Sequence, residues 1–130
     1  MTSKKIEFFI PVKPVPASRP RVSRWGTYFS KNYEAFRNEC YRYLSKIKRK
    51  YPQELGTFRV NILFICYKPK KPTQDYPRGD VDNFLKGPLD AMTKVGMVWH
   101  DDMQITKLTG TKRYAKEGEG VGMKVTITKL

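Results

Sequence analysis

The chain has 130 residues, in which 26 Lys and Arg outnumber 12 Asp and Glu and give a formal net charge of +14. This length predicts a single domain, the 13% aromatic content argues against intrinsic disorder, and no apolar run approaches the ~18 residues of a membrane span. The positive charge favours a polyanionic partner, nucleic acid ahead of an anionic membrane surface, over a merely soluble basic domain.

The cysteine and histidine content argues against a zinc or histidine-based metal site. Cys40 and Cys66 fall in different predicted elements, and His100 is the single histidine. Without a Cys-x-x-Cys pair or Cys/His ligand spacing, both thiols are interpreted as small apolar residues in a reducing compartment. The N-terminus has no apolar signal region, and we expect a cytoplasmic protein.

The first half of the chain predicts a strand, a loop and a helix. Alternating apolar residues predict a strand over 5–12. Four prolines in 11–27 predict a loop without regular structure. Apolar residues at three- and four-residue steps predict a helix over 31–51, with Ser30 as its N-cap.

The second half predicts a buried strand, a second helix and two closing strands. Residues 57–67 are apolar on both faces, which is typical of a strand inside a sheet. Helical spacing covers about 82–95, where Gly87-Pro88 predicts a kink or an irregular first turn. Strands over 103–114 and 121–130 are interpreted as a hairpin joined by 116–120. The order β-α-β-α-β-β predicts a single α/β (α+β) domain, a mixed sheet with helices packed on it.

Two proline-rich loops carry much of the positive charge. They are either solvated connectors or arms that grip phosphates, since guanidinium groups supply forked donors for phosphate oxygens. On the second interpretation the DNA-binding residues are Arg19, Arg21, Arg24, Lys68, Lys70, Lys71 and Arg78.

Acidic residues gather at two places, Gly79-Asp80-Val81-Asp82 and His100-Asp101-Asp102. One interpretation is structural: Asp82 caps the helix and pairs with Lys86, one turn on, while the later pair decorates a turn. The other is functional: the strand after Asp102 returns beside Asp80, and the carboxylates hold one or two Mg²⁺, which prefer oxygen ligands. Such an ion activates water and clamps a phosphate, and Lys86 then stabilises negative charge or orients the water.

The stretch from Gly79 to Met92, with its Asp-x-Asp-Asn-x-x-Lys pattern, followed by Asp101-Asp102-Met103-Gln104-Ile105, resembles the RusA family of Holliday junction resolvases. The resemblance is dense between 79 and 105 and weaker upstream, over 14–33. It implies a small dimeric endonuclease that depends on Mg²⁺, with Mn²⁺ as a possible substitute. It further implies that Asp80, Asp82 and Asp102 are metal-binding catalytic carboxylates, that Lys86 is the catalytic lysine, and that Asp101 is a lesser ligand.

These observations predict an endonuclease that resolves four-way DNA junctions by paired symmetric nicks. A two-fold homodimer supplies two equivalent sites for a symmetric substrate. The first alternative is a non-catalytic basic nucleic-acid-binding module of phage or prophage origin, which needs neither Asp80 nor a divalent ion. The second is a basic structural or assembly protein of a phage, which has no preference for branched DNA.

Overall fold

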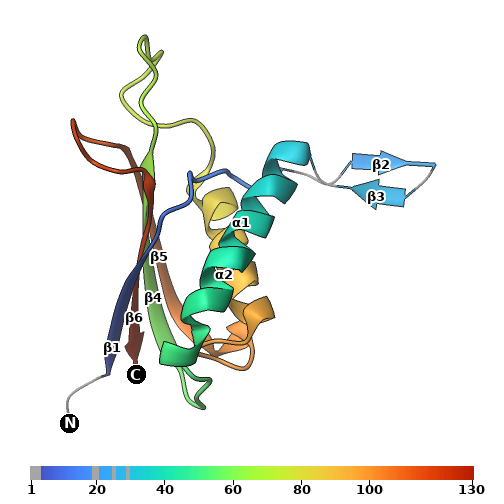
Figure 1. Ribbon diagram of the computed structural model, residues 1–130, viewed down its shortest axis with the longest axis vertical. Helices are drawn as coiled ribbons and strands as arrows, with labels where there is room; N and C mark the ends of the chain where they lie inside the picture. The colour runs from blue at the N-terminus through green and yellow to red at the C-terminus, as the bar shows by residue number, and fades with distance from the viewer. Residues whose placement is uncertain (1–3, 19–20, 25, 29) are drawn as a thin grey trace.

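One four-stranded sheet forms the base of the molecule. The computed structural model describes residues 4–18, 21–24, 26–28 and 30–130. In spatial order the strands are β1 (Lys5–Ile10), β6 (Gly122–Lys129), β4 (Phe58–Cys66) and β5 (Ile105–Tyr114) (Figure 1). β4 pairs in parallel with β5, whereas its pairing with β6 and that of β6 with β1 are antiparallel. The predicted mixed sheet is confirmed, and β4 lies inside it, as its apolar faces indicated.

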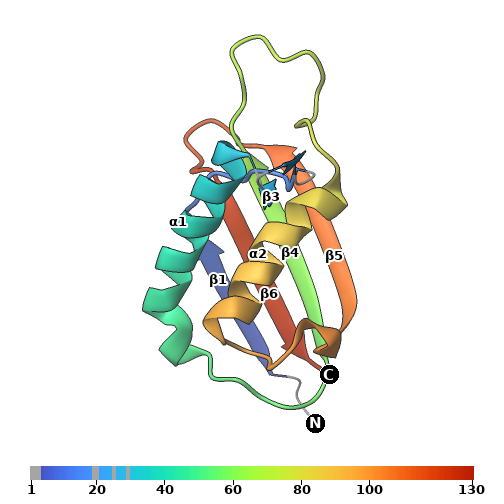
Figure 2. The same ribbon diagram turned by 90° about the vertical axis from the view of Figure 1, so that its right-hand side faces the viewer.

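Both long helices cover the same face of this sheet (Figures 1 and 2). Helix α1 (Lys31–Ile47) begins at Ser30, whose hydroxyl accepts a hydrogen bond from the Tyr33 amide at 3.3 Å, as the sequence predicted. The short 3₁₀ helix η1 (Lys48–Lys50) follows it. Helix α2 (Val81–Val95) ends at Gly96 in the left-handed conformation, with φ 76°. In the described part of the chain, no helix is long and apolar enough to cross a bilayer.

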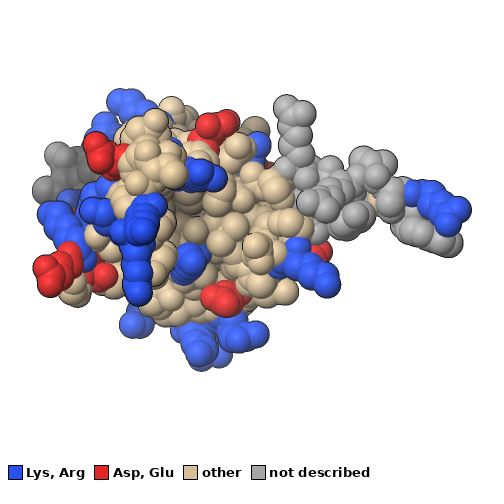
Figure 3. Space-filling model, turned by 90° about the horizontal axis from the view of Figure 1, so that it is seen from above, with Lys and Arg blue, Asp and Glu red and all other residues tan. Residues whose placement is uncertain are grey.

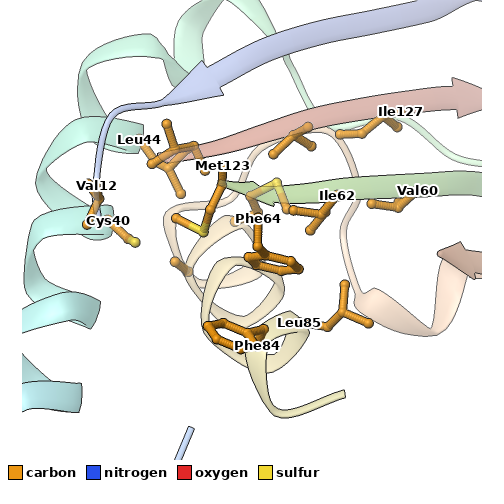
Figure 4. Close-up of a cluster of buried hydrophobic side chains, with 14 of the residues drawn as sticks. Val12, Cys40, Leu44, Val60, Ile62, Phe64, Phe84, Leu85, Met123 and Ile127 are labelled. Atoms are coloured by element: carbon orange, nitrogen blue, oxygen red, sulfur yellow. The ribbon is translucent and has the colours of Figure 1, made fainter. Parts of the chain in front are cut away.

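The core lies between the helices and the alternating residues of β4 and β6. Phe64 of β4 packs on Phe84 of α2 with ring centroids 5.3 Å apart, and Met123 of β6 is fully buried beside them (Figure 4). Cys40 and Cys66 are buried free thiols. Burial raises the pKa of Cys40 to about 12 and that of Cys66 to about 11. Both therefore stay protonated and act as apolar residues, as expected.

The predicted hairpin between the last two strands is wrong. β5 and β6 lie on opposite sides of β4, so residues 115–121 cross over the end of that strand. The Arg113 guanidinium donates two hydrogen bonds, of 2.6 and 2.8 Å, to the Glu119 carboxylate within this connection, and the Lys116 amide also donates to Glu119. A glycine-rich connection between two strands looks the same in sequence whether the strands pair or are separated by a third.

The prediction that 11–27 lacks regular structure is also wrong in part. Residues 21–28 contain an antiparallel pair, β2 (Arg21–Ser23) and β3 (Gly26–Tyr28), that forms a separate two-stranded sheet projecting from the helical layer (Figure 1). The prolines that argued against a strand end at Pro20, just before β2. Strand β3 begins at Gly26, which pairs with Ser23 and whose φ of 123° suits a residue without a side chain.

Helix α2 is continuous from Val81 to Val95 with Pro88 inside it, so the expected irregular first turn is absent, and the alternative, a kink at Gly87-Pro88, stays a prediction. Gly87 faces α1, and a Cβ atom added there would lie 2.5 Å from Cε2 of Phe36. The absence of a side chain at Gly87 therefore allows the two helices to pack closely.

We expect the Gly87→Ala substitution to lower the free energy of unfolding by about 1 kcal/mol or more, because overpacking outweighs the better helix propensity of alanine. Urea unfolding measures the loss. Gly120→Ala is the matched control, since nothing lies within 4 Å of a Cβ there and φ is not positive. Equal stability of the two variants would show that the α1–α2 contact is not tight.

Candidate metal site and nucleic-acid surface

Asp80 stands at the N-cap position of α2 and leaves its carboxylate uncommitted. Its backbone is extended, with φ −81° and ψ 141°, and its carbonyl accepts the amides of Asn83 and Phe84 at 3.0 and 3.1 Å. The Asp80 side chain makes no capping hydrogen bond. Helix α2 is therefore started by the backbone of Asp80, and the carboxylate remains exposed to solvent.

Asp82 and Lys86 do not form the ion pair that the structural interpretation required. Both side chains are exposed on α2, one turn apart. The Lys86 ammonium donates instead to the Asn83 side-chain oxygen at 3.3 Å. None of the ion pairs within the described residues includes Asp80, Asp82 or Lys86. The structural explanation of these residues, capping by Asp82 and pairing with Lys86, is not supported by the contacts.

The backbone before Asp80 is held by the end of strand β5. The Lys112 ammonium donates to the carbonyls of Pro77 and Gly79 at 2.7 and 2.6 Å. The Tyr114 hydroxyl donates to the carbonyl of Tyr76 at 2.8 Å. Sequence reasoning missed Lys112. The signal available was a lysine in a strand expected to return beside Asp80.

The segment 11–18 fixes the other side of this turn. The Ala17 amide donates to the Asn83 carbonyl at 2.9 Å, so the segment is bonded to the first turn of α2. Gly79 has φ 102°, and a Cβ there would lie 3.0 Å from both Pro16 and Phe84. Because glycine has no side chain, it can adopt this positive φ and leave room for Pro16 and Phe84. Asp80 is thus presented by a turn that is held from two sides.

Asp101 and Gln104 shape the turn before β5. The short 3₁₀ helix η2 (Asp102–Gln104) begins with a capping box, in which the Asp101 carboxylate accepts the Met103 amide at 2.8 Å. The Gln104 side chain accepts the His100 amide and donates to the carbonyls of Glu54 and Gly56. Part of the Asp-Asp-x-Gln motif therefore serves the fold, with one oxygen of Asp101 committed to a backbone amide.

Asp102 has acidic neighbours that influence its carboxyl group. Partial burial raises the pKa of its carboxyl, and the neighbouring Asp101, by hydrogen bond and charge, and the charge of Asp90 raise it further. Asp90 is exposed in the second half of α2. Asp102 therefore groups with Asp101 and Asp90, toward the C-terminal part of that helix.

Strand β5 does return beside the start of α2, but it is the second half of the strand that lies there and not its beginning, next to Asp102. A Cβ at Gly110 would lie 2.6 Å from Cγ1 of Val81, which places Gly110 against the start of α2. At about 3.3 Å per residue, Ile105 is roughly 17 Å further along the strand, and Asp102 precedes it. Figure 2 shows α2 running in the opposite direction to β5. The structure thus brings Asp80 and Asp82 together with Lys86, and it places Asp101 and Asp102 toward the other end.

The metal prediction can be tested against the donor atoms. Among residues 4–18, 21–24, 26–28 and 30–130, no group of three or more His, Cys, Asp and Glu side chains lies close enough to hold an ion. Mg²⁺, however, keeps several waters and is often bound through one or two carboxylates. The exposed Asp80 and Asp82 supply two such oxygen donors, which fit Mg²⁺ chemically. A site shared with Asp101 and Asp102 stays a prediction.

Exposed cations surround the end of the molecule that carries Asp80, and Figure 3 looks onto this end. Among the predicted DNA-binding residues, Arg19 and the side chain of Arg21 lie outside what the structure describes, and Arg24 is exposed beside the β2–β3 turn. The others lie in the loop between β4 and α2, where they are exposed and form no ion pair with another described residue: Lys68, Lys70, Lys71 and Arg78. Unpaired cations of this kind are available to phosphates.

The sequence was compared with protein families and with curated proteins. Residues 11–128 match the family model described as Endodeoxyribonuclease RusA. No curated protein matches the chain. The family match spans both the segment that packs against α2 and the whole sheet from β4 onward.

Proposed function

Since the chain belongs to the RusA endodeoxyribonuclease family, we propose that it is a Mg²⁺-dependent nuclease that resolves four-way DNA junctions by hydrolysis of phosphodiester bonds. The observation that carries this proposal is a pair of exposed carboxylates amid exposed cations, with Asp80 at the end of a turn that β5 holds and Asp82 in the first turn of α2. Two exposed acids in a chain of net charge +14 repel phosphate unless a cation bridges them.

In this mechanism Asp80 and Asp82 hold the ion, and Mn²⁺ is a possible substitute. When bound, the ion lowers the pKa of a coordinated water and neutralises charge on the phosphate. Lys86, one turn along α2, adds a positive charge that stabilises the transition state. Lys112 keeps the backbone of Gly79 in place and so fixes Asp80. The loop cations hold the DNA backbone, and shape selects the branched substrate.

Two nicks in opposing strands require two sites. We propose a two-fold homodimer, because each copy of the chain contributes one Asp80–Asp82 site and the symmetry of the dimer matches that of a four-way junction. Affinity for DNA then comes mainly from phosphate contacts of both copies.

The proposal is tested by incubating the protein with an end-labelled synthetic four-way junction and mapping the products on a denaturing gel. We expect nicks at symmetric positions in two opposing strands with Mg²⁺ and none in EDTA. Linear duplex of the same sequence is the control. Tight binding of the junction without any nick would support the non-catalytic binding module instead, and equal binding of branched and linear DNA would support a structural protein.

Lys112 provides a second test, because its ammonium donates hydrogen bonds to the carbonyls of Pro77 and Gly79 in the turn before Asp80. We expect Lys112→Met to lower kcat about 10- to 100-fold with little change in junction affinity, because small displacements of catalytic groups are costly. Lys107→Met removes the same charge from an exposed position on the same strand and is the control. Equal rates for the two variants would show that Lys112 does not position Asp80.

A further inference from the structure

A hollow of about 450 Å³ lies beside the Asp80 turn, between the segment 11–18, the end of β4 and the loop that follows it. Its size is in the range of cavities that bind small organic groups. Of the residues predicted to bind DNA, Lys71 and Arg78 lie in its wall, whereas Asp80, Asp82 and Lys86 do not line it. It is therefore a separate feature next to the candidate metal site.

The walls of this hollow combine aromatic rings with positive charge. Tyr67, Tyr114 and Phe84 supply the rings, and Lys13, Lys71 and Arg78 supply the charge. Among the residues that the structure describes, none with a carboxylate lines the hollow. Five prolines make up much of the remaining wall and restrict its backbone. Aromatic faces and cations together suit a group that is flat on one side and anionic on the other, as a nucleotide is.

Tyr67 is the most available of these rings. Whereas Phe84 is buried, this residue is 57% exposed. The Lys13 ammonium lies 5.2 Å from its ring centroid, a cation–π distance that orients the ring. The Tyr114 hydroxyl donates a hydrogen bond to the Tyr76 carbonyl, so a second ring in the wall is held in place as well.

The hollow shares a wall with the Asp80 turn. Phe84 lines it, and the amide of Phe84 donates to the carbonyl of Asp80 at 3.1 Å. Pro77, whose carbonyl accepts from Lys112, lines it too. A nucleotide seated in the hollow therefore lies next to the turn that carries Asp80.

We propose that the hollow receives one unstacked nucleotide of the DNA substrate at the branch point, with its base against Tyr67 and its phosphate among Lys13, Lys71 and Arg78. This inference rests on the proposed function. It gives a reason for a preference for branched DNA, because a base next to a branch is easier to unstack than one within a duplex.

The test is a double-mutant cycle, in which one change is made in the protein and the other in the DNA. The affinity of the protein for the junction is measured in EDTA for each combination. A four-way junction carries a fluorophore on one distant arm, and each nucleotide next to the branch is replaced in turn by an abasic one. With the wild-type protein we expect one position at which loss of the base weakens binding about tenfold, the size of one base–aromatic stack. With Tyr67→Ala we expect weaker binding of the intact junction and no further loss at that position.

Tyr76→Ala is the matched control. Tyr76 lies in the same loop with a side chain 58% exposed, but it does not line the hollow. We expect this variant to keep the abasic penalty. The inference is overturned if no position shows a penalty that differs between the wild type and Tyr67→Ala. Failure of the proposed function is seen separately, as absence of cleavage with Mg²⁺, because the cycle reads binding alone.

Discussion

The Asp80→Asn variant is expected to lose cleavage of a four-way junction by about a thousandfold or more while binding it as well as the wild type, or a few-fold tighter. Cleavage falls because the ion's stabilisation of charge in the transition state is worth several kcal/mol, and each 1.36 kcal/mol is a factor of ten in rate. Binding is kept because the substitution removes a negative charge that faces phosphates. Gel-shift titration in EDTA and single-turnover cleavage in Mg²⁺ measure the two effects.

The structure makes this variant a clean test. Asp80 starts α2 through its carbonyl, and its carboxylate takes part in no capping bond, so the fold does not depend on the charge. Asp75→Asn is the control, because it removes the same charge from an exposed position in the same loop. Normal cleavage by Asp80→Asn would remove Asp80 from the catalytic site, and an equal loss in both variants would indicate a general effect of charge.

The sequence predicted the elements of the fold better than their arrangement. Local patterns were sufficient for the two long helices and the strands of the main sheet, but not for β2 and β3. The Ser30 cap, the spacing of apolar residues in α1 and the two apolar faces of β4 all depend on neighbours within a few positions. The order of strands in the sheet was not available from such patterns. Whether 115–121 joins paired strands or crosses β4 is decided by packing of distant segments, with the Arg113–Glu119 bond stabilising the crossing.

In the candidate site, too, the features set by neighbouring residues could be predicted, and those set by distant segments could not. The turn before α2 and the exposure of Asp80, Asp82 and Lys86 follow from a short stretch of chain, and sequence reasoning placed them correctly at the start of a helix. The role of Lys112 requires knowing which strand, and which end of it, lies beside Gly79. For the same reason the sequence did not show that Gly110, and not Asp102, meets the start of α2.

Addition of Mg²⁺ or Mn²⁺ is expected to raise the melting temperature of the protein, because an ion that binds the folded state stabilises it by RT ln(1 + [L]/Kd). At a concentration one hundred times Kd this is about 2.7 kcal/mol, or roughly 10 °C for a domain of this size. The rise is expected to disappear in the Asp80→Asn, Asp82→Asn double variant. Thermal scans with EDTA and with increasing metal measure it without any need for DNA or catalysis.

The same scans decide which carboxylates share the ion. Asp102 lies with Asp90 and Asp101, away from the start of α2, and the pKa of its carboxyl is raised by partial burial and, to a smaller extent, by these two acidic neighbours. An unchanged rise in Asp102→Asn would remove Asp102 from the ligand set and leave Asp80 and Asp82 as the binding pair. A rise lost in Asp102→Asn would mean that Asp102 is also a ligand and that metal binding brings the η2 turn toward the start of α2. A rise that persists in the Asp80→Asn, Asp82→Asn variant would place the ion elsewhere and contradict the mechanism.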